Sequence, residues 1–209
     1  MTLRFVGEIA GLGSTAGVRV VVGHWTASPY GEFTDVMLQQ ADGWRVLLAP
    51  TEEIADFVAA TYVFDEVLVG PVTWQRTGST VRVTAPELSA SFVVGRRTGW
   101  GRLLQLIPGR LATVPGWSRL IAPLSAVLVP GVRTYGTAGG GRWESYGATD
   151  LHALDRAEGS WRGHELGGLA DVEPPVSVGF GSTPRRPGLT TLVTTIGLPA
   201  GAGQRGVSS

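Results

Sequence analysis

Short apolar runs with a period of two, separated by turn-forming residues, are the feature of this chain that most restricts its fold. Thr80-Val81-Arg82-Val83-Thr84 alternates polar and apolar side chains, as a strand with one buried face does. With 31 Gly and 13 Pro, the chain has many residues suited to turns between such strands. We therefore predict a mainly β protein, built as an antiparallel β cone or barrel. The other expected strands lie at 18–22, 34–38, 44–48, 66–69, 72–76, 89–94, 132–135, 143–154, 176–180 and 189–196.

Two kinds of helical addition are expected. Thr51 can cap a helix over 51–58, because two acidic residues follow it and Ile54, Phe57 and Val58 have helical spacing. Shorter helical pieces at 100–107 and 117–124 belong to an insertion near 98–129, which we expect to pack over one opening of the β structure. The prediction is a single domain over 1–196, capped by one or two short helices, with a disordered tail over 197–209.

The charge of the chain is unevenly distributed. No acidic residue lies between Leu88 and Trp143, whereas seven arginines do, so the stretch carries +7 and the remainder −7 (10 Arg against 17 Asp and Glu). Such a stretch suggests a surface that meets an apolar, anionic partner. The alternative is that these arginines pair with acids elsewhere in the fold. Since the net charge is zero and no recognised module is present, we expect no nucleic-acid partner.

Several classes of chemistry are excluded by composition. All 17 basic residues are arginine and there is no cysteine, so neither a side-chain Schiff base nor a thiolate nucleophile or zinc thiolate can form. The residues from Met1 to Phe5 do not begin a secretory signal, and the apolar stretch from Leu120 to Val132 is too short to cross a bilayer. We expect a soluble, cytoplasmic protein with no membrane span.

The segment Ser28-Pro29-Tyr30-Gly31-Glu32-Phe33-Thr34-Asp35-Val36 resembles the Gly-Pro-Tyr-x-Glu strand entry of the acetoacetate decarboxylase-like superfamily. The resemblance covers roughly residues 19–97. It implies a β cone or barrel with a cavity for a small organic ligand. The decarboxylases of that family form a Schiff base on a lysine, but the matching stretch here, Phe64-Asp65-Glu66, has none. The resemblance therefore implies the cavity without that reaction.

Three hypotheses about function follow, and none of them calls for a cofactor. The first is a binding pocket for a small, apolar, anionic organic molecule. Arginines would neutralise the ligand and tryptophans would line the walls. The residues expected to bind the ligand are Trp25, Trp74, Arg96, Arg97, Trp100 and Arg102.

The second hypothesis is a lysine-independent acid–base enzyme, a lyase or hydrolase acting on a small carboxylic acid. His24, Asp35 and Glu66 are its candidate catalytic residues, and it requires them to converge in one pocket. A serine–histidine site is not expected, because Ser28 and His24 would be about 13 Å apart on a strand. No metal site is expected either, because His152 and His164 lack a recognised ligand spacing. The third hypothesis is that the arginine-rich stretch forms a homodimer contact or rests on an anionic membrane surface.

Overall fold

The structure is a computed structural model that describes residues 1–106, 135–137, 141–178 and 183–198. Two helices, α1 (Glu52–Ala59) and α2 (Gly99–Leu104), accompany 13 strands in this part of the chain. Neither helix is long and apolar enough to cross a membrane. The strands are β1 (Thr2–Ser14), β2 (Arg19–Ala27), β3 (Phe33–Gln39), β4 (Arg45–Ala49), β5 (Glu66–Val69), β6 (Thr73–Thr77), β7 (Thr80–Ala85), β8 (Leu88–Arg97), β9 (Tyr135–Thr137), β10 (Trp143–Trp161), β11 (His164–Glu165), β12 (Leu169–Ala170) and β13 (Gly188–Gly197).

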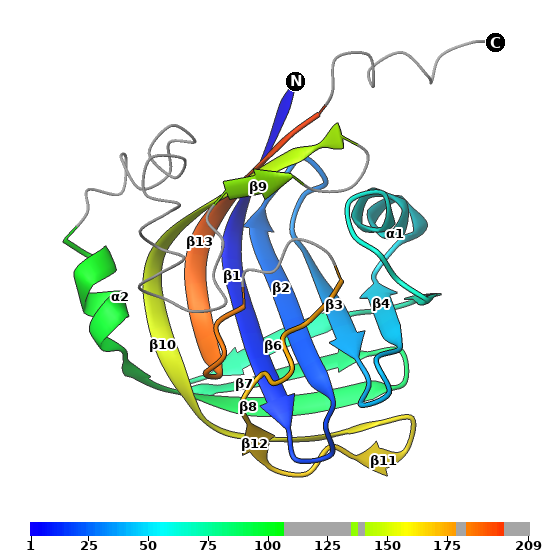
Figure 1. Ribbon diagram of the computed structural model, residues 1–209, viewed down its shortest axis with the longest axis vertical. Helices are drawn as coiled ribbons and strands as arrows, with labels where there is room; N and C mark the ends of the chain where they lie inside the picture. The colour runs from blue at the N-terminus through cyan, green and yellow to red at the C-terminus, as the bar shows by residue number, and fades with distance from the viewer. Residues whose placement is uncertain (107–134, 138–140, 179–182, 199–209) are drawn as a thin grey trace.

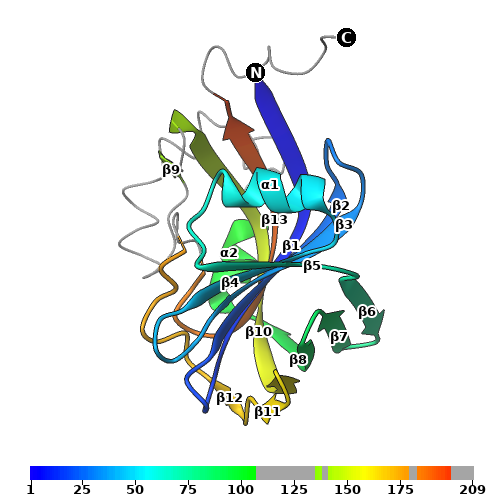
Figure 2. The same cartoon turned by 90° about the vertical axis from the view of Figure 1, so that its right-hand side faces the viewer.

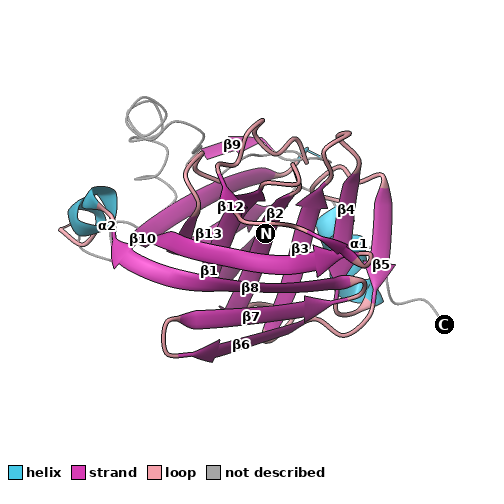
Figure 3. Cartoon of the chain, turned by 90° about the horizontal axis from the view of Figure 1, so that it is seen from below, coloured by secondary structure: helices cyan, strands magenta, loops and turns pink. Residues whose placement is uncertain are grey.

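All the strands join one strongly curled sheet (Figures 1 and 3). Its order is β5-β4-β3-β2-β1-β13-β10-β8-β7-β6, with β9 and β11 paired to β10, and β12 paired to β1. The pairs are antiparallel except β4 with β5, which are parallel. The end strands β5 and β6 are not paired with each other in the described residues, so the sheet is an open half-barrel. The predicted mainly β, curled, antiparallel fold with short helices is confirmed.

The two faces of the sheet bury different cores. Val20, Val36 and Leu38 point to one face, where they pack against Val81 and Val83 of β7. Figure 2 shows the strands β6, β7 and β8 on that side, and the segment 171–178 on the other. Since each fully buried aliphatic side chain contributes roughly 1.5–3 kcal/mol, packing holds the two halves of the curled sheet together without hydrogen bonds between its ends.

The opposite face of the sheet carries α1. Ile54, Ala55 and Val58 of the helix pack against Phe33 and Leu47. As the sequence predicted, Thr51 caps the helix, and its Oγ1 accepts a hydrogen bond of 3.3 Å from the Ile54 N–H. The helix thus closes over the sheet face that holds the candidate site.

Strand β1 was missed by the sequence prediction, although it lies between β2 and β13 at the centre of the sheet. Glycines interrupt its apolar pattern, and glycine has low β-propensity. Two of them are required by close approach: a Cβ on Gly11 would lie 2.0 Å from Thr183 Cγ2, and one on Gly13 would lie 2.0 Å from the Asp171 carbonyl oxygen. Two of the glycines that weaken the strand signal are thus those that Asp171 and Thr183 approach closely.

A second prediction, a strand at 176–180, is wrong for the residues of this range that the structure describes. Residues 176–178 are not a strand, and Val63 N–H donates a hydrogen bond of 2.6 Å to the Val178 carbonyl. Other expectations lie wholly or partly outside the described residues: the helical piece at 117–124, most of the insertion near 98–129, and the tail from residue 199. Gly197, where the tail was expected to begin, is the last residue of β13.

Candidate functional site

A cavity of about 60 Å³ lies between the sheet and α1. By volume it has room for roughly four or five water molecules or one small organic molecule. Alternate residues of five strands form its floor, while α1, the turn after it, Val176, Val178 and Thr183 form its walls. The lining residues are Phe5, Ile9, Val21, Gly23, Trp25, Phe33, Asp35, Met37, Phe57, Val58, Tyr62, Glu144, Tyr146, Val176, Val178, Thr183, Thr194 and Ile196.

One ionisable group in this mainly apolar cavity is Asp35, at the centre of β3. Its side chain is buried, with the residue 3% exposed, and Trp25 Nε1 donates a hydrogen bond of 2.9 Å to Asp35 Oδ1. Burial raises the pKa of the carboxyl to about 7, although the hydrogen bond from Trp25 acts in the opposite direction. Asp35 is therefore neutral in part near physiological pH, and can both donate and accept a proton there.

The pairing of Asp35 with Trp25 depends on Gly23, which lies opposite Asp35 in the β2–β3 register. A Cβ at position 23 would lie 2.7 Å from Asp35 Oδ1 and 2.8 Å from Trp25 Nε1. The indole can therefore fold back across the sheet to the carboxyl only because position 23 has no side chain.

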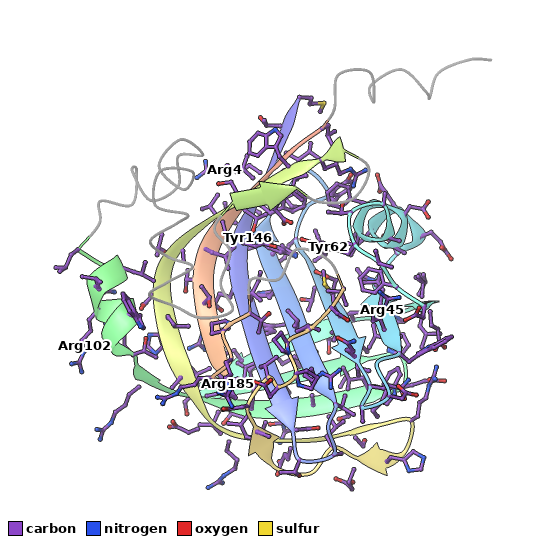
Figure 4. The ribbon with its side chains drawn as sticks, in the orientation of Figure 1. Arg4, Arg45, Tyr62, Arg102, Tyr146 and Arg185 are labelled. Atoms are coloured by element: carbon purple, nitrogen blue, oxygen red, sulfur yellow. The ribbon has the colours of Figure 1, made fainter. Side chains whose placement is uncertain are left out.

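A second buried carboxyl, Glu144 at the start of β10, also lines the cavity. The residue is 1% exposed, and its two oxygens lie 2.7 and 2.8 Å from Tyr62 Oη, which donates to them. The Tyr146 hydroxyl lies 3.1 Å from Tyr62 Oη. Figure 4 shows Tyr62 and Tyr146 in the same region of the molecule, between β10 and α1. Burial raises the pKa of Glu144 to about 7 and that of Tyr62 well above its ordinary value.

The structure separates the three residues proposed for acid–base catalysis. Asp35 lines the cavity, but His24 follows Gly23 on β2 and therefore points to the opposite face of the sheet. There its ring stacks on Trp74 at 4.8 Å, and Nδ1 lies 3.0 Å from Thr34 Oγ1. Glu66 is on the edge strand β5, where it binds Arg162 and Trp44. The three do not converge in one pocket.

The residues proposed to bind a ligand are also divided. Trp25 lines the cavity, whereas Trp74 lies with His24 on the other face. Trp100 and Arg102 are on α2, and Figure 4 shows Arg102 at the outer side of that helix, away from Tyr62 and Tyr146.

In the part of the arginine-rich stretch that the structure describes, one arginine forms an ion pair and another is exposed. Arg97 Nε donates to Asp150 Oδ1 at 2.9 Å, while Arg96 is exposed. No arginine or histidine is among the described residues that line the cavity. Arg110, Arg119 and Arg133 lie outside the described residues, so the interaction hypothesis for this stretch stays a prediction.

Glu144, Tyr62 and Tyr146 were not anticipated from the sequence. The available signal was the alternation of Glu144 and Tyr146 within a predicted strand, which puts both side chains on one face. Tyr62 follows α1 directly, and no local pattern predicts that its hydroxyl reaches a carboxyl 82 positions away.

No protein-family model matches the chain, and no curated protein matches it. The fold is similar to that of a crystal structure of acetoacetate decarboxylase from Legionella pneumophila subsp. pneumophila str. Philadelphia 1. The similarity covers 93% of this chain and 84% of that chain, at 9% sequence identity and a TM-score of 0.43. What the site can do follows from its own residues.

Proposed function

We propose that the chain binds a small, largely apolar organic acid in the cavity between the sheet and α1. The observation that carries the proposal is an apolar cavity into which two buried carboxyls with pKa values of about 7 face. Ligand pockets combine apolar and aromatic walls with a few polar groups that orient the guest. Here Phe5 and Trp25 in the floor and Phe57 in the wall supply the aromatic surface.

The groups that would balance the charge of the ligand are not those expected from the sequence. Arg96, Arg97 and Arg102 were the residues expected from the sequence to neutralise it, but none of them lines the cavity. A protonated Asp35 or Glu144 can instead donate a hydrogen bond to a ligand carboxylate, because each holds a proton near neutral pH.

Ligand-observed NMR and thermal shift with butanoic acid and longer aliphatic acids test the proposal. We expect millimolar binding to the wild-type chain, because so small a ligand offers few contacts. Ile9→Phe, which enlarges a cavity-lining side chain, should abolish the binding. Val67→Phe is the matched control, since Val67 is an exposed residue of β5. Failure of every acid to bind the wild-type chain would contradict the proposal.

A second candidate, lysine-independent acid–base catalysis, is favoured by the same two carboxyls. In this version Asp35 and Glu144 transfer the protons, and Glu144 takes the place proposed for His24 and Glu66. Groups with pKa values near 7 suit proton transfer at neutral pH. In D2O, NMR should show exchange of the α-protons of a small ketone such as butanone faster than in buffer. Asp35→Asn and Glu144→Gln should each slow it, and exchange at the buffer rate would remove this candidate.

A further inference from the structure

Thr194 carries a hydroxyl with no apparent structural role. The residue is 2% exposed, and its Oγ1 is buried with no hydrogen-bond partner among the described residues. Leaving a buried hydroxyl unpaired costs free energy, and most such groups in proteins are paired. Because Thr194 lines the cavity, its hydroxyl is placed to meet a guest.

The other polar groups at this end of the cavity surround Thr194. Tyr146 is its cross-strand neighbour on β10, and Glu144 lies opposite Ile196, two residues further along β13. Tyr62 enters from the turn after α1 and donates to Glu144. Three hydroxyls and one carboxyl thus gather here, while Phe5 and Ile9 on β1 continue the floor as apolar surface.

We infer that Thr194, Glu144 and Tyr62 form a subsite that binds the oxygen-bearing head of the ligand in uncharged form, so that an acid enters together with one proton. The inference rests on the proposed function and specifies the site within it. Thr194 Oγ1 donates to one ligand oxygen, and the second oxygen shares a proton with the Glu144 carboxyl.

The charges around the subsite favour an uncharged head. Glu144 is faced by the hydroxyls of Tyr62 from the turn after α1 and of Tyr146 from β10, and the other carboxyl of the described lining is that of Asp35 on β3. The nearby Arg142 is directed to α1, where it donates to the Phe57 carbonyl and to Thr61 Oγ1. Among the residues that the structure describes, an anion without its proton would therefore meet carboxylates and no facing cation.

Two probes of equal length separate charge from shape. Butanoic acid should bind with a Kd that weakens up to about tenfold for each pH unit above pH 7, because one proton must bind with it. Butanamide, which is uncharged, should bind with little change between pH 6 and pH 8. Kd values from NMR titration at both pH values provide the measurement.

Thr194→Val replaces the unpaired hydroxyl with a methyl group of the same shape. We expect both probes to bind about fivefold to tenfold more weakly, as for the loss of one hydrogen bond. The melting temperature without ligand should stay the same or rise, because no protein hydrogen bond is lost. Thr194→Ser should retain affinity. Thr195→Val, the same change on the opposite face of β13, should not affect binding.

Other results would distinguish failure of the subsite from failure of the proposed function. If the probes bind and Thr194→Val leaves their Kd values unchanged, the subsite is wrong while the proposed function stands. If Thr194→Val lowers the melting temperature without ligand by more than Thr195→Val does, the hydroxyl is structural and the inference fails. If neither probe binds the wild-type chain, the proposed function itself fails.

Discussion

At the scale of a single residue, Gly23 allows the hydrogen bond between Trp25 and Asp35 in the cavity. Its missing side chain leaves space in which Trp25 Nε1 reaches Asp35 Oδ1 at 2.9 Å. Without that contact Asp35 would be a buried carboxyl with no side-chain donor among the described residues, a costly arrangement. A glycine within a strand, normally unfavourable there, is thus explained by the close approach of two side chains.

Gly23→Ala should therefore destabilise the fold by on the order of 1–3 kcal/mol, because the new methyl displaces the indole from Asp35. Urea unfolding followed by tryptophan fluorescence measures the change. Gly99→Ala is the control, since a Cβ there would meet nothing within 4 Å. Equal stability of the two variants would show that the sheet accommodates the methyl without breaking the Trp25–Asp35 bond.

At the scale of the element, α1 is held at its C-terminus by a residue that is distant in the sequence. Its own last turn has no basic residue. Arg142, just before β10, donates to the Phe57 carbonyl at 3.1 Å, and its guanidinium carbon lies 5.2 Å from the centre of the Phe57 ring. A positive charge at this end of a helix is stabilising. The contact also holds in place the end of α1, from which the turn with Tyr62 continues.

Arg142→Met keeps the length of the side chain but removes the charge and the donors. We expect a loss of about 1–2 kcal/mol in the free energy of unfolding, from the helix-end charge and the lost hydrogen bonds. Chemical denaturation of this variant is compared with that of Arg102→Met, which alters an exposed arginine on α2. If the two variants lose the same stability, Arg142 does not anchor the helix.

At the scale of the whole molecule, the two buried carboxyls make stability depend on pH. In the unfolded chain Asp and Glu ionise near 3.8 and 4.5, whereas in the fold both pKa values are about 7. Between these values the folded protein holds more protons, so the stability that these two carboxyls contribute is fully present below about pH 4 and is lost as the pH rises through about 7. The Arg45–Asp65 pair acts outside this window, since the pKa of Asp65 is lowered to about 2.

Urea unfolding of the wild-type chain should give a lower free energy of unfolding at pH 8 than at pH 5. The slope should be on the order of 1 kcal/mol per pH unit for each carboxyl between those values. Asp35→Asn and Glu144→Gln should each reduce the slope, and the double variant should flatten it most. His24, whose pKa burial lowers, acts in the opposite direction but is present in all four proteins. A wild-type slope equal to that of the double variant would contradict the buried, partly protonated carboxyls.

The features that could be predicted from the sequence are those that depend on residues close together in the chain. The strands at β3, β7 and β8 and the helix α1 came from local periodicity and capping, which nearby residues determine. Strand β1 was missed because two of its glycines, Gly11 and Gly13, are explained by contacts with residues about 160 to 170 positions away. Trp25 and Asp35 were chosen as candidates, but Glu144 and Tyr62 were not, because only the pairing of β10 with β13 and the position of α1 bring them to the same cavity.

The amino-acid sequence alone predicted a curled antiparallel sheet, because period-two patterning is a property of neighbouring residues. It also excluded lysine and cysteine chemistry, because the chain contains neither residue. Only the tertiary structure decided which carboxyls are buried. His24 and Asp35 looked equivalent in the chain, yet the two faces of the sheet separate them. Glu66 remained at an open edge, while Glu144 was enclosed by α1. Burial, and with it a pKa near 7, arises from elements that meet only in the folded molecule.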